Sequence, residues 1–229
     1  MISIENRNLW LLFRINDTDI YATETMLATW IISVVLIIFA IFARIRVKSF
    51  KDIPSGFQNL LEIAVESLDS LVRSTVGEKL DYIGGYYFGI FAFILMSNYS
   101  GLFGLRTPTS DLTTTIPLAM TTFIIIHTLG LREQKGNYFK QYIRPNPIFL
   151  PINLIGEISK PISLAFRLFG NMLGGVIILE FVYTLLPVFL RFLLPDILHA
   201  YFDIFASTLQ AFVFTVLSQT FIQFIAAPY

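Results

Sequence analysis

The sequence predicts an all-α membrane protein that crosses the bilayer about five times as a single membrane domain over residues 1–229. Of the 229 residues, 55% are hydrophobic and only 14% are charged, whereas soluble domains average about 45–50% apolar and about 25% charged residues. The mean hydropathy of the chain is +0.69. The apolar residues gather in runs long enough to cross a bilayer, which takes about 20 residues in a helix.

The first crossing is expected over residues 25–43, after a mixed and polar outer segment, residues 1–24. A basic cluster that begins at Arg44 follows it. A long apolar run with a basic flank behind it is a stop-transfer pattern and not a cleavable signal peptide. Residues 54–76 place leucines and acids at helical spacing, and Pro54 suits the first turn of a helix. This segment is therefore predicted to be an amphipathic helix that lies on the membrane surface or on protein.

Two further crossings are expected over residues 82–103 and 116–131, joined by a turn-rich loop that contains Asp111. The last part of the chain is predicted to form two long helices over residues 150–186 and 199–227. The first of these would be about 55 Å long at 1.5 Å per residue, against about 30 Å of hydrocarbon. It must tilt strongly, lie partly along the membrane, or break.

Basic residues fix the expected orientation. They cluster after the first and the third crossings, over residues 44–51 and 132–144. An even number of crossings separates the two clusters, so both lie on the same side, which the positive-inside rule makes the cytoplasm, matrix or stroma. The N-terminus is then outside and the C-terminus inside.

An arginine, Arg167, lies deep inside the first long helix. A charge at a helix centre in the bilayer costs roughly 2.5–3.5 kcal/mol, and such a residue marks a functional site by default. Ser163 and Asn171 lie four residues to either side on the same face, and Lys160 is one turn before Ser163. Glycines that permit close approach of another helix follow at Gly170, Gly174 and Gly175. The pattern indicates an ion pathway, or an electrostatic partner for an acidic group inside the membrane.

The last helix carries a second polar face, which consists of His199, Asp203, Ser207 and Gln210. Gln210 can exchange a hydrogen bond with Asn171 or with water. Asp203 lies toward the outer end, where a water-filled path could reach it and let it relay protons.

Structural roles are open for several of these residues. Arg167 could pair with an acid of the same chain, Glu157 or Glu180, although Glu180 lies nearly opposite Arg167 on a helical wheel. Asp203 could be satisfied by loop amides at the interface, and Gln210 could join two helices. Asp111 fits a turn or a helix cap as well as an ion path. The two histidines, at 127 and 199, lack metal-ligand spacing.

Several classes of function find no support. The sequence contains no glycine-rich phosphate loop, no nucleophile elbow and no H-E-x-x-H motif, so no catalytic site and no cofactor are expected on this chain. Its formal net charge is zero, and nothing suggests nucleic-acid binding. The absence of cysteine excludes disulfides and thiolate metal sites.

Three segments resemble one known family. Pro151–Ser163, followed by Arg167–Asn171, resembles the signature of subunit a of F-type ATP synthases. Thr208–Phe214 resembles the second signature in the last helix, and Pro108–Leu112 the segment between the second and third crossings. The likeness is specific in about the last 80 residues and in that loop, and it rests on two signatures in order on adjacent long helices.

The resemblance implies the ion-translocating stator subunit of a rotary ATP synthase. Such a subunit packs against a ring of c subunits and offers two aqueous half-channels to the ring carboxylates, for H+ or Na+. It would work with peripheral-stalk b subunits, the F1 ATPase head and the lipid bilayer. A bacterial plasma membrane is expected, with an organellar inner or thylakoid membrane as the alternative.

The resemblance also implies roles for individual residues. Arg167 matches the arginine that separates the half-channels and couples ion flow to ring rotation. Many bacterial members of the family carry an acid at the position of Val176, and Glu180, one turn on at a different position on the helical wheel, is the candidate substitute. Ser163 would line the cytoplasmic path, and Asp203 with Asp111 the outer one. The residues assigned to ion translocation are Arg167, Asn171, Gln210, Ser163, Asp203, Glu180, Asp111 and Lys160.

Two rival functions are a secondary transporter or channel that acts without an ATPase, and an assembly subunit without an ion path. Transporters usually show repeated halves and broken helices around a midplane site, and this sequence shows neither clearly.

Overall fold

The computed structural model describes residues 10–15, 18–48, 50, 56–143, 146–187 and 194–226. Pro54, residues 1–9 of the outer segment and Ala227 at the end of the last expected helix lie outside these ranges. Five of the described helices are long and apolar enough to cross a membrane. The predicted class, an all-α polytopic membrane protein, is therefore confirmed.

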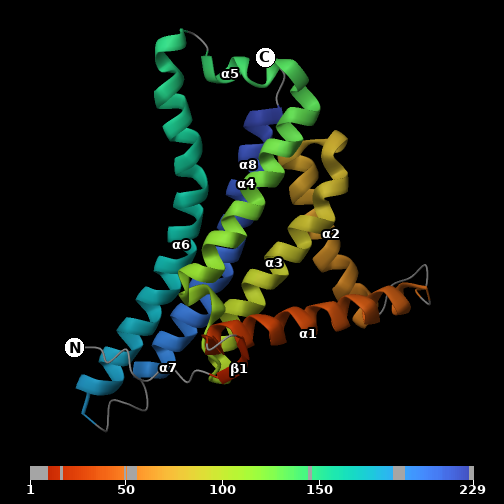
Figure 1. Ribbon diagram of the computed structural model, residues 1–229. Coiled ribbons are helices and arrows are strands. Elements are labelled where there is room, and N and C mark those ends of the chain that lie inside the picture. The colour runs from red at the N-terminus through yellow and green to blue at the C-terminus, as the bar shows by residue number, and fades with distance from the viewer. Residues whose placement is uncertain are drawn as a thin grey trace.

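Helix α1 (Glu24–Val47) stands apart from the other helices. It begins at an N-cap, Thr23, whose hydroxyl accepts a hydrogen bond from the backbone amide of Met26 at 3.3 Å. Only three of its residues are buried, all near its start. In Figure 1 α1 lies across the foot of the bundle at a steep angle to α3, α4, α6 and α8. Most of its apolar surface is thus free to contact lipid.

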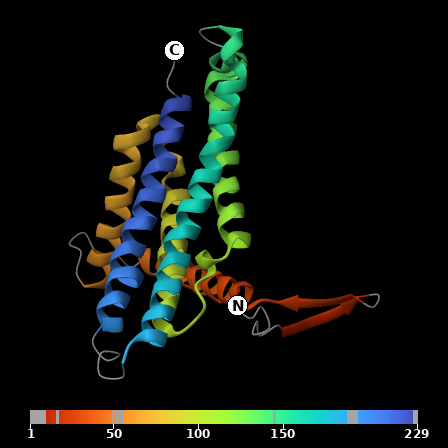
Figure 2. The same ribbon diagram turned by 90° about the vertical axis from the view of Figure 1, so that its left-hand side faces the viewer.

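A short hairpin precedes α1 and projects away from the bundle (Figure 2). It pairs β1 (Trp10–Ile15) with β2 (Thr18–Ala22) in antiparallel register. This hairpin is a small β element that the sequence-based expectation of a mixed and polar segment did not include.

Helix α2 (Phe57–Val76) is the amphipathic helix. Glycines with positive φ flank it, Gly56 at 57° and Gly77 at 90°. Val72 is its one fully buried side chain among the described residues, and α2 packs on α3 and α8. The short helix η2 (Glu78–Ile83) then leads into α3.

The rest of the bundle is built by α3 (Gly84–Tyr99), α4 (Leu112–Gln134), α6 (Leu150–Leu185) and α8 (Ser207–Ala226). Short helical turns make the connections: η3 (Ser100–Phe103), η4 (Pro108–Ser110), η5 (Lys135–Asn137), α5 (Lys140–Ile143) and η6 (Pro147–Phe149). Buried side chains from α2, α3, α4, α6 and α8 meet in one core that includes Tyr87, Ile94, Ile126, Leu168 and Phe214.

Helix α6 is continuous over 36 residues in spite of Pro161 inside it. At 1.5 Å per residue it is about 54 Å long, which exceeds the hydrocarbon thickness of about 30 Å, and the helix does not break. Helix α7 (Leu194–His199) runs into a π-helical turn, η8 (Ala200–Ala206), and then into α8. π-turns often occur at functional sites. The position of η8 on the polar face of the last helix therefore marks this face as part of a candidate site.

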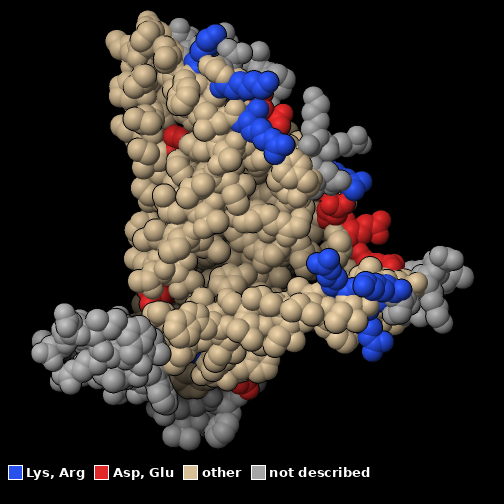
Figure 3. All heavy atoms as spheres, turned by 45° about the vertical axis from the view of Figure 1, so that its right-hand side comes forward, with Lys and Arg blue, Asp and Glu red and all other residues tan. Residues whose placement is uncertain are grey.

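Charged side chains gather on one side of the molecule (Figure 3). Basic groups lie at the end of α1 and at the end of α4, and acids lie between them. The exposed basic residues at the end of α1 are Arg44, Arg46 and the C-cap Lys48, and those at and after the end of α4 are Arg132, Lys135 and Lys140. The acids of α2 include Glu62, Glu66 and Asp69. The two basic clusters therefore share one polar face, along which α2 lies.

Candidate functional site

Arg167 lies in the middle of α6 and is exposed. Among the described residues it has no hydrogen-bond or ion-pair partner. The buried residues of α6 form the stripe Leu164, Leu168, Met172, Gly175 and Leu179, and Arg167 lies about 100° from Leu168 around the helix. The guanidinium therefore occupies a flank of α6 that the described part of the chain leaves uncovered.

The same flank carries Ser163 and Asn171, and both are exposed. The Asn171 side-chain amide donates to the Gln210 side-chain carbonyl at 2.5 Å, which joins α6 to α8. Gln210 is only 3% exposed. Its own amide nitrogen, Nε2, is buried without a partner among the described residues. A buried donor in that condition costs free energy, so it needs water or another chain.

Helices α6 and α8 approach each other closely beyond this bond. A Cβ atom added to Gly175 would lie 3.3 Å from the side chain of Phe202. The Ser207 hydroxyl oxygen lies 3.6 Å from the sulfur of Met172. At Gly170 and Gly174, an added Cβ would have no other atom within 4 Å. Of these three glycines of α6, Gly175 packs closely against the turn that precedes α8, whereas Gly170 and Gly174 leave open space.

Lys160 is engaged in an ion pair. Its Nζ atom lies 2.9 and 2.8 Å from the two carboxylate oxygens of Glu157, which is 9% exposed. His127 Nε2, from α4, lies 3.7 Å from Glu157 Oε1. Since Glu157 takes Lys160 and His127 as its partners, it does not pair with Arg167.

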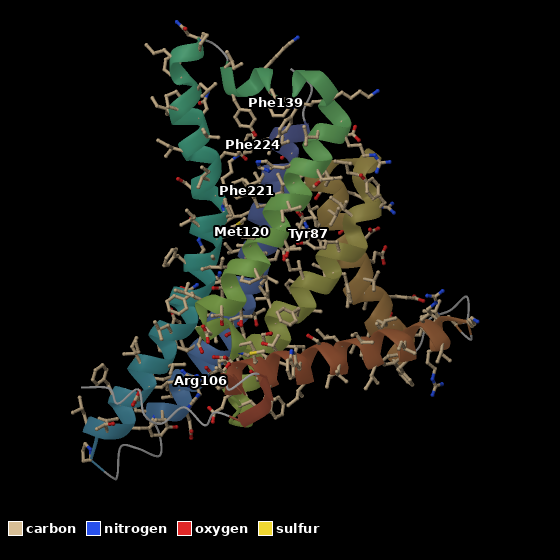
Figure 4. All side chains as sticks on the ribbon, in the orientation of Figure 1. Tyr87, Arg106, Met120, Phe139, Phe221 and Phe224 are labelled. Atoms are coloured by element: carbon tan, nitrogen blue, oxygen red, sulfur yellow. The ribbon has the colours of Figure 1, made fainter. Side chains whose placement is uncertain are left out.

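An apolar pocket of about 410 Å³ adjoins this ion pair between α4, α5 and α6, and Phe123, Tyr138, Phe139 and Leu154 help to line it. Figure 4 shows Phe139 and Phe221 in the space between α6 and the α4–α8 pair. Lys160 Nζ lies 5.4 Å from the ring centre of Phe221.

Asp203 lies in the π-helical turn and is 8% exposed. Its Oδ2 atom is 2.5 Å from Nδ1 of His199, and the Tyr183 hydroxyl is 3.1 Å from Nε2 of the same histidine. The partner of Asp203 is therefore a side chain of its own helix and not a loop amide. The spacing placed His199 and Asp203 on one face, but sequence reasoning gave His199 no role.

Asp111 caps α4. Its Oδ1 accepts from the backbone amide of Thr113 at 3.1 Å, and its Oδ2 accepts from the Thr25 hydroxyl of α1 at 3.1 Å. It also lines a small pocket with Glu24 and Arg106. The cap role that the sequence left open is thus present.

Glu180 is exposed on α6. It follows Arg167 by 13 positions, which is about 140° around the helix. The structure does not bring Glu180 to the flank of Arg167, and its part in ion translocation stays a prediction.

A buried polar layer that sequence reasoning missed joins α3, η4 and the last helix. Asn98 is fully buried. Its amide donates to the Ser207 carbonyl at 3.3 Å, and its side-chain oxygen accepts from the Thr109 hydroxyl at 2.6 Å. The loop residue Thr109 is fully buried too. Only the three-dimensional packing of distant segments reveals this layer.

The fold and the site define a multi-pass membrane protein that carries charged and polar side chains within its spanning helices. The family model described as "ATP synthase A chain" matches residues 26–223. The chain is also 34% identical, over 212 residues, to the "ATP synthase subunit a, chloroplastic" of Stigeoclonium helveticum, with 87% of this chain and 82% of the relative covered. The chain belongs to the ATP synthase A chain family.

Membership of this family sets the general role. The chain is a membrane subunit of the Fo sector with an ion-translocating stator role, and it is not the catalytic subunit. It works as part of a complex with the c ring and other subunits.

Proposed function

We propose that the α6 flank that carries Arg167 faces the carboxylates of the c ring and separates two aqueous half-channels. The observation that carries this proposal is the exposed guanidinium, which has no partner among the described residues. An isolated charge in a bilayer is costly, so a carboxylate from another chain is the natural partner. A guanidinium stays charged, and its field favours the ionised form of a passing carboxylate.

The surroundings of Arg167 support a close approach by a ring helix. Ser163 and Asn171 are exposed on the same flank. Gly170 and Gly174 offer open space beside them, and small residues let helix backbones approach closely in membranes. The Asn171–Gln210 bond would hold α6 and α8 in register behind this contact.

Polar groups on either side of Arg167 support the two paths. Toward the end of α6 lie Tyr183 and the His199–Asp203 pair, which would serve the outer path together with Asp111. Toward its start lie Ser163 and Lys160, which would serve the cytoplasmic path. Buried polar atoms without a partner among the described residues occur on α3, α4 and the last helix, at Ser97, Thr115, Gln210 and Gln219. Water in a half-channel would supply those partners.

The charged face supports the orientation. With the ends of α1 and α4 in one aqueous phase, α2 would lie along that interface, and α1 would cross the bilayer at a steep angle to the bundle helices (Figure 1). By the positive-inside rule that phase is the cytoplasm, matrix or stroma, which places the N-terminus outside. The strong tilt of α6 then follows from its length.

The proposal is tested with the whole ATP synthase in vesicles. Arg167→Ala should leave the complex assembled, with the c ring, the peripheral stalk and the F1 head copurifying, but abolish ATP-driven ion uptake. Each charge that moves across 100 mV carries about 2.3 kcal/mol, and a leak between the half-channels dissipates that energy. Acidification and sodium uptake are both recorded, so either coupling ion is detected.

The matched control is Arg132→Ala. Arg132 is an exposed arginine in the last turn of α4, and its Cζ atom lies 5.6 Å from the centre of the Tyr82 ring. This variant should pump normally. Normal pumping by an assembled Arg167→Ala complex would overturn the proposal.

A further inference from the structure

A chain of hydrogen-bonding side chains runs from the surface of α6 to the buried carboxylate in the π-helical turn. The Tyr183 hydroxyl is 3.1 Å from His199 Nε2, and His199 Nδ1 is 2.5 Å from Asp203 Oδ2. Exposure falls along this chain. Tyr183 is 44% exposed, the His199 side chain is 33% exposed and the Asp203 side chain is 11% exposed.

We propose that His199 is the proton-transfer residue that delivers protons between the outer solution and Asp203. The outer path would therefore carry protons and not sodium ions. This inference rests on the proposed function, because it needs Asp203 to lie on the outer half-channel. It adds a residue and an ion to that function.

The chemistry is a balanced proton transfer through the imidazole ring. A proton from the outer water binds to Nε2 and makes an imidazolium. The Nδ1–H bond then breaks as an O–H bond forms on Asp203 Oδ2, and the ring is left neutral with its proton on Nε2. The ring returns to its starting tautomer when Nε2 releases its proton to water and Nδ1, turned away from Asp203, takes up a proton from water, so that one proton in total passes from water to Asp203. Histidine suits this task because its ordinary pKa is near neutrality.

The π-helical turn holds the pair in place. The Ser207 hydroxyl donates to the Phe202 carbonyl at 3.0 Å, and Gly175 of α6 makes room for the Phe202 ring. Asp203 is also packed against the turn after α3, since a Cβ atom at Gly101 would lie 3.9 Å from its Cγ. Asp203 is therefore held beside His199, with only 11% of its side chain exposed.

Among the residues that the structure describes, the charged and titratable groups on the neighbouring elements are few. Helix α6 brings Tyr183 and, one turn earlier, Glu180; α7 brings Asp196; and the loop after α3 brings Arg106, labelled in Figure 4. Of these described groups, only Tyr183 is hydrogen-bonded to His199. The exposed Tyr183 hydroxyl therefore lies beside Nε2, and a proton from water reaches Nε2 when this hydrogen bond opens.

The test uses the whole complex in vesicles, with ATP synthesis driven by a potassium diffusion potential and no pH gradient. His199→Gln keeps a hydrogen-bonding side chain but cannot carry a proton. We expect a loss of rate of about tenfold or more, with normal assembly. Imidazole at rising concentrations should restore much of that rate, because it can carry protons to Asp203. His127→Gln, the matched control on α4, should show neither effect.

Asp203→Asn should lose the same transport and stay insensitive to imidazole, since the acceptor is gone. The inference is overturned if assembled His199→Gln keeps its rate, or if imidazole restores none of a lost rate, as expected for a purely structural ion pair. It is also overturned if the wild-type complex takes up sodium and not protons. Sodium uptake by the wild-type complex would overturn this inference alone, because the Arg167→Ala test of the proposed function holds for either ion.

Discussion

Gly130 marks the tightest crossing in the bundle and allows a quantitative prediction. A Cβ atom added at this position on α4 would lie 2.2 Å from Cγ2 of Ile225 on α8, and 2.6 Å from the ring of Tyr138. Neither neighbour moves easily. Cγ2 branches at the Cβ of Ile225, and the Tyr138 hydroxyl is hydrogen-bonded to that of Tyr142 at 2.8 Å.

The change Gly130→Ala therefore sets two effects against each other. Overpacking a filled core costs about 1–3 kcal/mol, and two contacts this short place Gly130 at the upper end of that range. Alanine regains up to about 1 kcal/mol of helix propensity over glycine. The net loss of stability is then about 2 kcal/mol, which lowers the midpoint of thermal unfolding by about 4–8 °C for a chain of this size.

Thermal unfolding of the purified subunit in detergent measures this shift. The control is Gly89→Ala on α3, where an added Cβ would meet no other atom within 4 Å; it should unfold at or slightly above the wild-type temperature. A Gly130→Ala variant as stable as the Gly89→Ala control would refute the reasoning.

Three further predictions concern buried polar groups. Asn98→Ala leaves the Thr109 hydroxyl without its acceptor and should lower stability by about 1–2 kcal/mol; an unchanged unfolding temperature would contradict the buried layer. Burial raises the pKa of the Tyr138 hydroxyl above its ordinary value of 10.0. The protonated Tyr138 hydroxyl therefore makes its full contribution to the stability of the fold below pH 10, the pKa of tyrosine in the unfolded chain. This contribution is lost as the pH rises through the higher pKa of the folded state. Tyr138→Phe should remove this part of the alkaline decline in unfolding temperature, and an identical alkaline profile would count against it. Glu157→Gln leaves the charge of Lys160 without its ion-pair partner. The double variant Glu157→Gln/Lys160→Met should therefore unfold at a higher temperature than the single variant Glu157→Gln. A lower unfolding temperature of the double variant would show that the ion pair is not the relevant interaction.

The sequence predicted the fold well because the bilayer requires long apolar runs. Five such runs are present as helices, and their number and order follow from hydropathy alone. The hairpin at Trp10–Ala22, the steep angle of α1 and the π-turn around Asp203 were not predicted, since they depend on local pairing and on packing between helices. Hydropathy carries no information on either.

In the candidate site too, features within one helix could be predicted from the sequence, and contacts between helices could not. The 3.6-residue period predicted that Ser163, Arg167 and Asn171 share a flank, because all three lie on one helix. It could not predict that His127 lies near Glu157, because these residues lie on different helices and no pattern in the sequence links them. The His199–Asp203 hydrogen bond could be predicted only in part. The four-residue spacing of His199 and Asp203 showed that they share one helix face. The possible proton-transfer role of His199 became apparent only when the structure placed the Tyr183 hydroxyl beside His199 Nε2.

Photo-cross-linking from α6 within the whole complex tests most directly whether the Arg167 flank faces the ring. The chain has no cysteine, so a single introduced cysteine can carry a photoreactive group at one chosen position. Gly174 lies seven residues after Arg167, almost on the same line of the helix, whereas Val176 lies about 200° further around from Gly174. The account predicts that Gly174→Cys cross-links to the c subunit and that Val176→Cys does not. Cross-links to the c subunit from Val176→Cys alone, or equally from both positions, would contradict it.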